Sequence, residues 1–193
     1  MPEKLHQKTD GSPGSRTERA RLENSLKEAG FGDFAWINPG HVIVAQWVRV
    51  KCTFGCSDYG SGSCPPNTPT VEACREFFAE YNSGVMIRMT VDADRHDYPL
   101  KWSTEMTARL LALEKEVFFM NYPKTFLLNQ SCCTLCSACP GSRKDCTHKI
   151  QSRPSPEAFA VDVYSTAENA GLKINVITES PSVIHRIAIL LIK

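Results

Sequence analysis

The chain has 193 residues, with 22 basic and 21 acidic side chains and a formal net charge of +1. Charges balanced in this way, with no long basic stripe, argue against nucleic acid as a partner. No apolar run reaches the roughly 18 residues that a membrane span needs, whereas 42% hydrophobic residues suffice for a core without disulfide staples.

Polar residues with early Gly and Pro predict a disordered tail over 1–13, followed by a single domain over 14–193. Hydrophobic periodicity and turn residues define the elements of this domain. In chain order we expect a helix over 15–29, strands over 34–37 and 42–50, a helix over 71–81, a strand over 84–91, a helix over 100–121, a strand over 125–128, a helix over 156–170 and strands over 173–177 and 184–192.

The longest of these helices carries an apolar stripe from Trp102 to Met120, with members three or four residues apart, which is wide enough to pack against a sheet. The elements predict an α/β (α+β) fold: one domain with a mixed sheet, helices packed on it and two cysteine-rich loops, 52–66 and 132–148. Each loop is expected to follow a strand, so strand ends at one edge of the sheet would bring the two loops together.

Nine cysteines are present, and seven of them fall into two groups. The first group is Cys52, Cys56 and Cys64, and the second is Cys133, Cys136, Cys139 and Cys146. The odd number of cysteines and the absence of an apolar segment in the first residues argue against disulfides in a secreted protein. We therefore expect a cytoplasmic protein with reduced thiols, which in such clusters most often bind a metal or serve redox catalysis.

The second group favours an iron–sulfur cluster. Its first three thiols are spaced as in the C-x₂-C-x₂-C run of bacterial ferredoxins, and Cys146 can supply a fourth thiolate to a [4Fe–4S] cluster. Zinc is the alternative, although a zinc site usually takes its ligands as two separated pairs. His148 is a further ligand candidate, with a surface histidine as the simpler interpretation.

The first group offers only three thiols. Its site either leaves one position open, as substrate binding requires, or borrows a ligand from elsewhere. Cys74 is one candidate, although its place in a predicted helix suggests a small core residue. Cys132 is another, because the side chains of neighbouring residues point apart and Cys132 would reach the first group if the two loops meet. The sequence thus indicates one or two clusters.

Two segments resemble the signatures of a prokaryotic family of unknown function that is described as predicted metal-binding and is common in anaerobes. The first is Trp47-Val-Arg49-Val-Lys51-Cys52-x₃-Cys56-x₂-Tyr59-Gly60-x₃-Cys64-Pro65-Pro66-x₂-Pro69. The second is Cys133-x-Leu135-Cys136-x₂-Cys139, with Cys146-x-His148, Arg153-Pro154-Ser155-x-Glu157-Ala158 and Asp162-Val163. The resemblance implies metal binding, with iron–sulfur as the expectation, and supplies no reaction. Members commonly carry a cysteine where this chain has Phe159.

Three functions are compatible with these patterns. The first is an electron carrier or redox accessory protein with one or two [4Fe–4S] clusters and a redox partner protein. The second is an enzyme or a maturation factor that uses an open three-cysteine site. The third is a zinc-binding module that presents an interaction surface. A P-loop, a GxGxxG run and an HExxH motif are all absent from the sequence.

Overall fold

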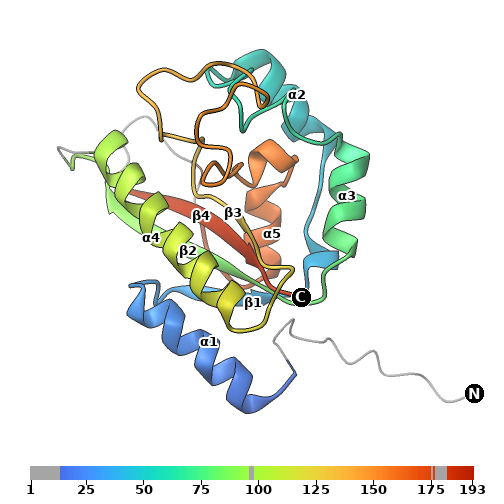
Figure 1. Ribbon diagram of the computed structural model, residues 1–193, viewed down its shortest axis with the longest axis vertical. Helices are drawn as coiled ribbons and strands as arrows, with labels where there is room; N and C mark the ends of the chain where they lie inside the picture. The colour runs from blue at the N-terminus through green and yellow to red at the C-terminus, as the bar shows by residue number, and fades with distance from the viewer. Residues whose placement is uncertain (1–13, 96–97, 175, 177–181) are drawn as a thin grey trace, which may run out of the picture.

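The computed structural model describes residues 14–95, 98–174, 176 and 182–193. The tail expected over 1–13 lies outside the described residues. The elements are α1 (Arg16–Glu28), β1 (Phe34–Ile37), η1 (Pro39–His41), α2 (Gln46–Gly55), α3 (Val71–Ala79), β2 (Gly84–Asp92), α4 (Leu100–Phe119), β3 (Phe126–Leu128), η2 (Glu157–Phe159), α5 (Val163–Asn169) and β4 (Val183–Leu191) (Figure 1).

A four-stranded sheet lies between two layers of helices, in the order β1-β2-β4-β3. The longest pairing joins β2 and β4, from Gly84 opposite Leu191 to Asp92 opposite Val183. Helices α1 and α4 cover one face of the sheet, and α3 and α5 lie on the other (Figure 1). This arrangement confirms a single α+β domain. All described strand pairs are antiparallel, so the sheet is not the mixed sheet expected from the sequence.

The central strands are buried on both faces. Val85 and Ile87 pack into the core beneath α1 and α4, while Met86 between them packs into the core beneath α3 and α5. All three side chains are fully buried. The predicted apolar stripe of α4 fills the first core, with Leu110 and its neighbours one turn away on either side. Successive side chains of a strand point to opposite faces, so a continuous apolar run is what a sheet covered on both sides requires.

The N-terminal helix α1 begins with a capping box. Ser15 Oγ accepts from the backbone N–H of Glu18, and the Glu18 carboxylate accepts from the backbone N–H of Ser15. Further along the helix, the Glu23 carboxylate accepts from the indole N–H of Trp36 on β1 and from Arg19, at 2.9 Å each. The bond from Trp36 attaches α1 to the edge strand of the sheet, and the bond from Arg19 holds the Glu23 carboxylate in place within the helix.

The segment 42–50 is not the strand that its valines and isoleucine suggested. Val44 makes one isolated bridge with Val161, and the chain then turns into helix α2. Arg49 of this helix donates through its guanidinium to Thr68 Oγ1 and to the carbonyls of Pro69 and Ala158. These three long-range bonds outweigh the local β-propensity. The first cysteine loop therefore follows a helix.

The segment 156–170 is also divided differently from the expectation. Ser155 Oγ does accept from Ala158 N–H, but only one 3₁₀ turn follows, and Ala160 then takes a left-handed conformation at φ 59°. Helix α5 begins after Asp162, whose carboxylate accepts from Ser165 N–H. The expected strand over 173–177 falls partly outside the described residues, and 173–174 are not in a strand.

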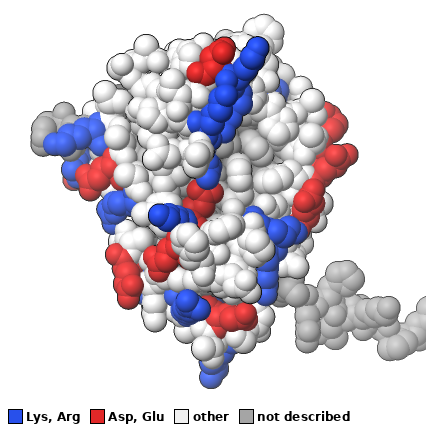
Figure 2. Space-filling model, in the orientation of Figure 1, with Lys and Arg blue, Asp and Glu red and all other residues white. Residues whose placement is uncertain are grey.

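Two surface properties agree with the composition. On the face shown in Figure 2, most of the surface is uncharged, one short run of basic side chains crosses the upper part beside an acidic group, and elsewhere basic and acidic side chains are interspersed. Within the described part of the chain, every helix is too short or too polar to cross a bilayer.

Candidate metal centre

The two cysteine loops lie against each other at one end of the sheet. The backbone N–H of Gly62 in the first loop donates to Cys139 Sγ in the second, at 3.3 Å. The side-chain amide of Asn67 lies 3.1 Å from the carbonyl oxygens of Gly60 and Ser61 and 3.3 Å from that of Gly141. One amide therefore joins the backbones of both loops. The expected meeting of the loops is confirmed, although the first leaves from a helix end rather than a strand end.

Six thiols from the two loops line one open cavity of about 560 Å³. They are Cys52, Cys56, Cys64, Cys132, Cys133 and Cys136. Cys52 lies in the last turn of α2 and Cys56 is its C-cap, so the two are one turn apart and share a helix face. Other walls of the cavity come from the start of α4, from η2 and from Arg186 of β4.

The remaining three cysteines lie outside this cavity lining. Cys139 is exposed and contacts the first loop through Gly62, whereas Cys146 is half-buried. Thr147, next to Cys146, places its Oγ1 3.6 Å from Cys136 Sγ. Cys74 is fully buried in the core under α3, with its Sγ 3.7 Å from the carbonyl oxygen of Pro69.

All nine cysteines are described, and all are free thiols. The covalent pairing that would have removed them from metal chemistry is thus absent. Among the described residues, no three His, Cys, Asp or Glu side chains converge closely enough to hold one ion. The loops therefore bring the donors to one cavity without fixing a coordination shell. A donor set made of sulfur suits soft metals and iron–sulfur clusters, so the residues fit such a group.

Burial controls the acidity of the thiols in the cavity. It raises the pKa of Cys64 to about 12, with a further contribution from the charge of Cys132. The pKa of Cys132 rises to about 12, first through burial and then through a hydrogen bond with Asp58. Burial also raises the pKa of Cys52. These thiols are protonated at neutral pH, so binding a metal as thiolates must release their protons.

Cys139 has the opposite environment. The backbone N–H groups of Gly62 and Gly141 hold its pKa below the ordinary value of 9.0. Donation from two N–H groups stabilises the thiolate, which is also how proteins hold cluster sulfur ligands.

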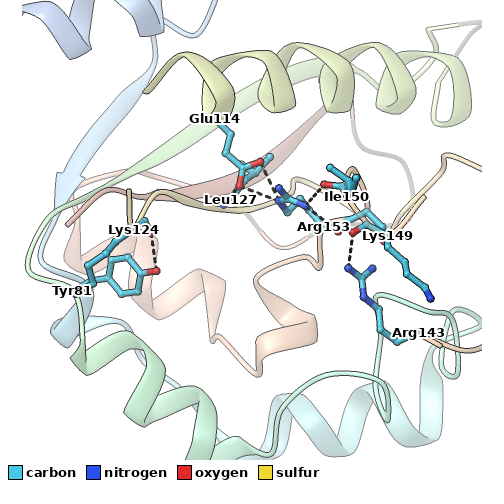
Figure 3. Close-up of polar contacts among 9 residues, drawn as sticks. Tyr81, Glu114, Lys124, Leu127, Arg143, Lys149, Ile150 and Arg153 are labelled. Atoms are coloured by element: carbon cyan, nitrogen blue, oxygen red, sulfur yellow. Dashed lines mark hydrogen bonds and ion pairs between the residues drawn. The ribbon is translucent and has the colours of Figure 1, made fainter. Parts of the chain in front are cut away.

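Glu114 anchors both ends of the second loop (Figure 3). It is buried in α4 and its Oε1 accepts from the backbone N–H of Leu127, just before the loop, at 2.9 Å. After the loop, Arg153 Nε lies 2.9 and 3.0 Å from the two carboxylate oxygens. Arg153 Nη1 also donates to the carbonyl of Ile150 at 2.8 Å. One carboxylate thus fixes the entry and the exit of the segment that carries the second cysteine group.

Sequence reasoning did not single out Glu114, Asn67 or Asp58. A signal existed for Glu114, which is a charged residue beside the apolar stripe of α4, and for Asp58, which lies inside the first cysteine loop. Asn67 gave no signal, because its partner at Gly141 is 74 residues away. Among the singled-out residues, His148 is half-buried and faces Gln151, with Nδ1 3.3 Å from Oε1, and it does not line the cavity.

The structure is an α+β domain whose two loops bring thiols to one cavity, and thiolates are the ligands that soft metals prefer. A family model described as predicted metal-binding protein (DUF2284) matches residues 35–192, and the chain belongs to this family. The match confirms the resemblance seen in the two cysteine signatures. No curated protein and no solved structure matches the chain.

Phe159, which stands where family members commonly carry a cysteine, lies in the core of the domain. Its ring packs 5.5 Å from Phe77 and 6.1 Å from Phe126, centroid to centroid, and the residue is buried. The side chain belongs to an aromatic cluster in the core beneath α3 and α5, and it is not part of the cavity lining.

Proposed function

We propose that this chain is an iron–sulfur protein that carries one or two [4Fe–4S] clusters and acts in electron transfer or as a redox accessory protein in the cytoplasm. The observation that carries the proposal is the cavity where six free thiols from two distant segments meet. A cluster bound there supplies reversible one-electron chemistry, with its potential set by the surrounding hydrogen bonds and exposure.

Ligand spacing favours iron–sulfur over zinc. Cys133, Cys136 and Cys139 repeat an interval of three residues, which suits several irons of one cluster better than the two separated pairs of a zinc site. The chain also offers eight thiols in or beside the two loops, more than one tetrahedral ion takes.

Three features of this chain would serve a bound cluster. Gly62 N–H already donates to Cys139 sulfur, and such donors raise the reduction potential. Asn67 holds the loops in register, while Glu114 and Arg153 hold the ends of the second loop. An exposed opening of the cavity gives a partner protein a short path for electrons.

A second candidate function is an enzyme or maturation factor that uses the first group as an open site. Arg186 favours it, because this cationic side chain lines the same cavity as the thiols and is oriented by Tyr98 Oη, which accepts from Nε at 3.0 Å. A small anion would find a counter-charge there. This function predicts that an added small carboxylate changes the paramagnetic resonance spectrum of one cluster.

The deciding experiment is metal and sulfide analysis of protein purified without oxygen. We expect about four iron atoms and about four acid-labile sulfides per cluster, a brown colour, and an electron paramagnetic resonance signal that appears on reduction with dithionite. Colourless protein with stoichiometric zinc and no sulfide would contradict the proposal and support a zinc-binding interaction module.

A further inference from the structure

We propose that Cys132 completes a four-thiolate set with Cys52, Cys56 and Cys64, and that Cys133, Cys136, Cys139 and Cys146 form the second set. The inference rests on the proposed function, and it adds which thiols share which cluster. It removes the open position from the first group by drawing its fourth ligand from the other loop.

The position of Cys132 supports this assignment. Its side chain lines the cavity together with the three thiols of the first group. A hydrogen bond with Asp58, two residues beyond Cys56 and itself in the cavity lining, ties Cys132 to the first loop. The four thiols therefore face one cavity, although 68 positions separate Cys64 from Cys132 in the sequence.

The neighbouring Cys133 belongs to the other set. It lines the cavity together with Cys136 of the same group. It also begins the evenly spaced run that continues with Cys136 and Cys139. Adjacent side chains diverge in most backbones, so a single Cys-Cys step can contribute one ligand to each of two adjacent sites.

Cys74, the other spare thiol, has no place in either set. It is fully buried and does not line the cavity. Its sulfur lies 3.7 Å from the carbonyl oxygen of Pro69, just before its own helix. Cys74 is therefore the matched control for Cys132: a cysteine of the same chain, near the first group in sequence, that lies in the core and outside the cavity lining.

The test compares the iron and sulfide content of Cys132→Ala, Cys64→Ala and Cys74→Ala with the wild type, all prepared without oxygen. Alanine is used because a serine oxygen can itself bind iron. We expect Cys132→Ala and Cys64→Ala to lose the same fraction of the bound iron and sulfide, about half if two clusters are present. The double variant should lose no more iron and sulfide than either single variant. Cys74→Ala should keep the full content.

Alkylation of the unsubstituted protein makes the test independent of how well the variants fold. Because Cys64 is buried even without a metal, the labelling is done in moderate urea: iodoacetamide should leave Cys132 and Cys64 equally unlabelled in iron-loaded protein and should label both once the iron is removed. Full iron in Cys132→Ala, or labelling of Cys132 while Cys64 stays protected, would overturn the assignment and leave the iron–sulfur proposal standing. Wild-type protein without iron and sulfide would instead overturn the proposed function itself.

Discussion

Glu114→Gln is the sharpest test of how the second cysteine loop is held. The carboxylate accepts one bond from Leu127 N–H and receives Arg153 Nε on both oxygens. Glutamine keeps an oxygen for one donor, but it loses the charge and turns an amide N–H group toward the guanidinium. Breaking a fully buried pair from one side costs about 3–5 kcal/mol. The Arg153 side chain is 21% exposed and that of Glu114 is 9% exposed, so solvent screens part of this cost.

We therefore expect Glu114→Gln to lower the free energy of unfolding by about 2 kcal/mol, which is close to the value of one hydrogen bond to a charged group. In a chain of this length, that loss lowers the melting temperature by about 4–8 °C. The measurement is urea and thermal unfolding of the metal-free protein under reducing conditions, followed by circular dichroism.

Glu105→Gln is the matched control, because Glu105 lies exposed on the same helix and should change stability by less than about 0.5 kcal/mol. Pairing Glu114→Gln with Arg153→Met gives a double-mutant cycle, in which the double variant should lose less than the sum of the single losses. If Glu114→Gln were as stable as Glu105→Gln, the carboxylate would not anchor the loop.

Three further changes test other parts of the structure. Gly30→Ala should cost about 2–3 kcal/mol, because a Cβ at φ +81° would lie 1.7 Å from Arg109 Nη2 and would displace the guanidinium from its two bonds to the Ala29 carbonyl. Gly171→Ala, at φ +78° with no heavy atom within 4 Å of the added Cβ, should cost only about 1 kcal/mol, and equal losses in urea melts would refute the packing argument. Asn67→Ala should speed the removal of iron from loaded protein by a chelator at least fivefold, because about 1 kcal/mol of bonding between the loops is lost; an unchanged release rate would mean that other contacts hold them. The hydrogen bond from the Trp36 indole, and then that from Arg19, hold the pKa of Glu23 below its ordinary value of 4.5. Ionised Glu23 therefore stabilises the fold above about pH 4.5, and this contribution disappears as the pH falls through the lowered pKa. Glu23→Gln should make the free energy of unfolding fall less steeply in acid, and an unchanged acid dependence would contradict this.

Local patterns were enough for the elements that fill the core. The apolar stripe from Trp102 to Met120 predicted α4, and the apolar runs around Val85 and Ile189 predicted the two long strands. In each case, burial follows the same periodicity that the sequence displays, so the signal lies within a single segment.

The secondary structure of two other segments was predicted wrongly, because contacts outside each segment determine it. The valines of 42–50 favoured a strand, but the chain forms helix α2 there, and Arg49 of this helix bonds to the distant carbonyls of Pro69 and Ala158. The cap at Ser155 was real, but the left-handed turn at Ala160 ended its helix after one turn. For the candidate site, spacing identified the two cysteine groups. Their shared cavity, and the place of Cys132 in it, depend on how the loops pack, which no single segment encodes.

The order of strands in the sheet determines when, during synthesis of the chain, the two cysteine loops can come together. Strand β4 lies between β2 and β3, yet it follows both of them in the sequence. Until residues 183–191 have been made, β3 lacks its partner in the sheet, and only Glu114 of α4 is in place to hold the start of the second cysteine segment. The thiols near residue 52 leave the ribosome long before their counterparts are held in place. In the proposed centre, thiols from both loops would therefore come together only after β4 has been made, and the early cysteines would have to stay reduced until then.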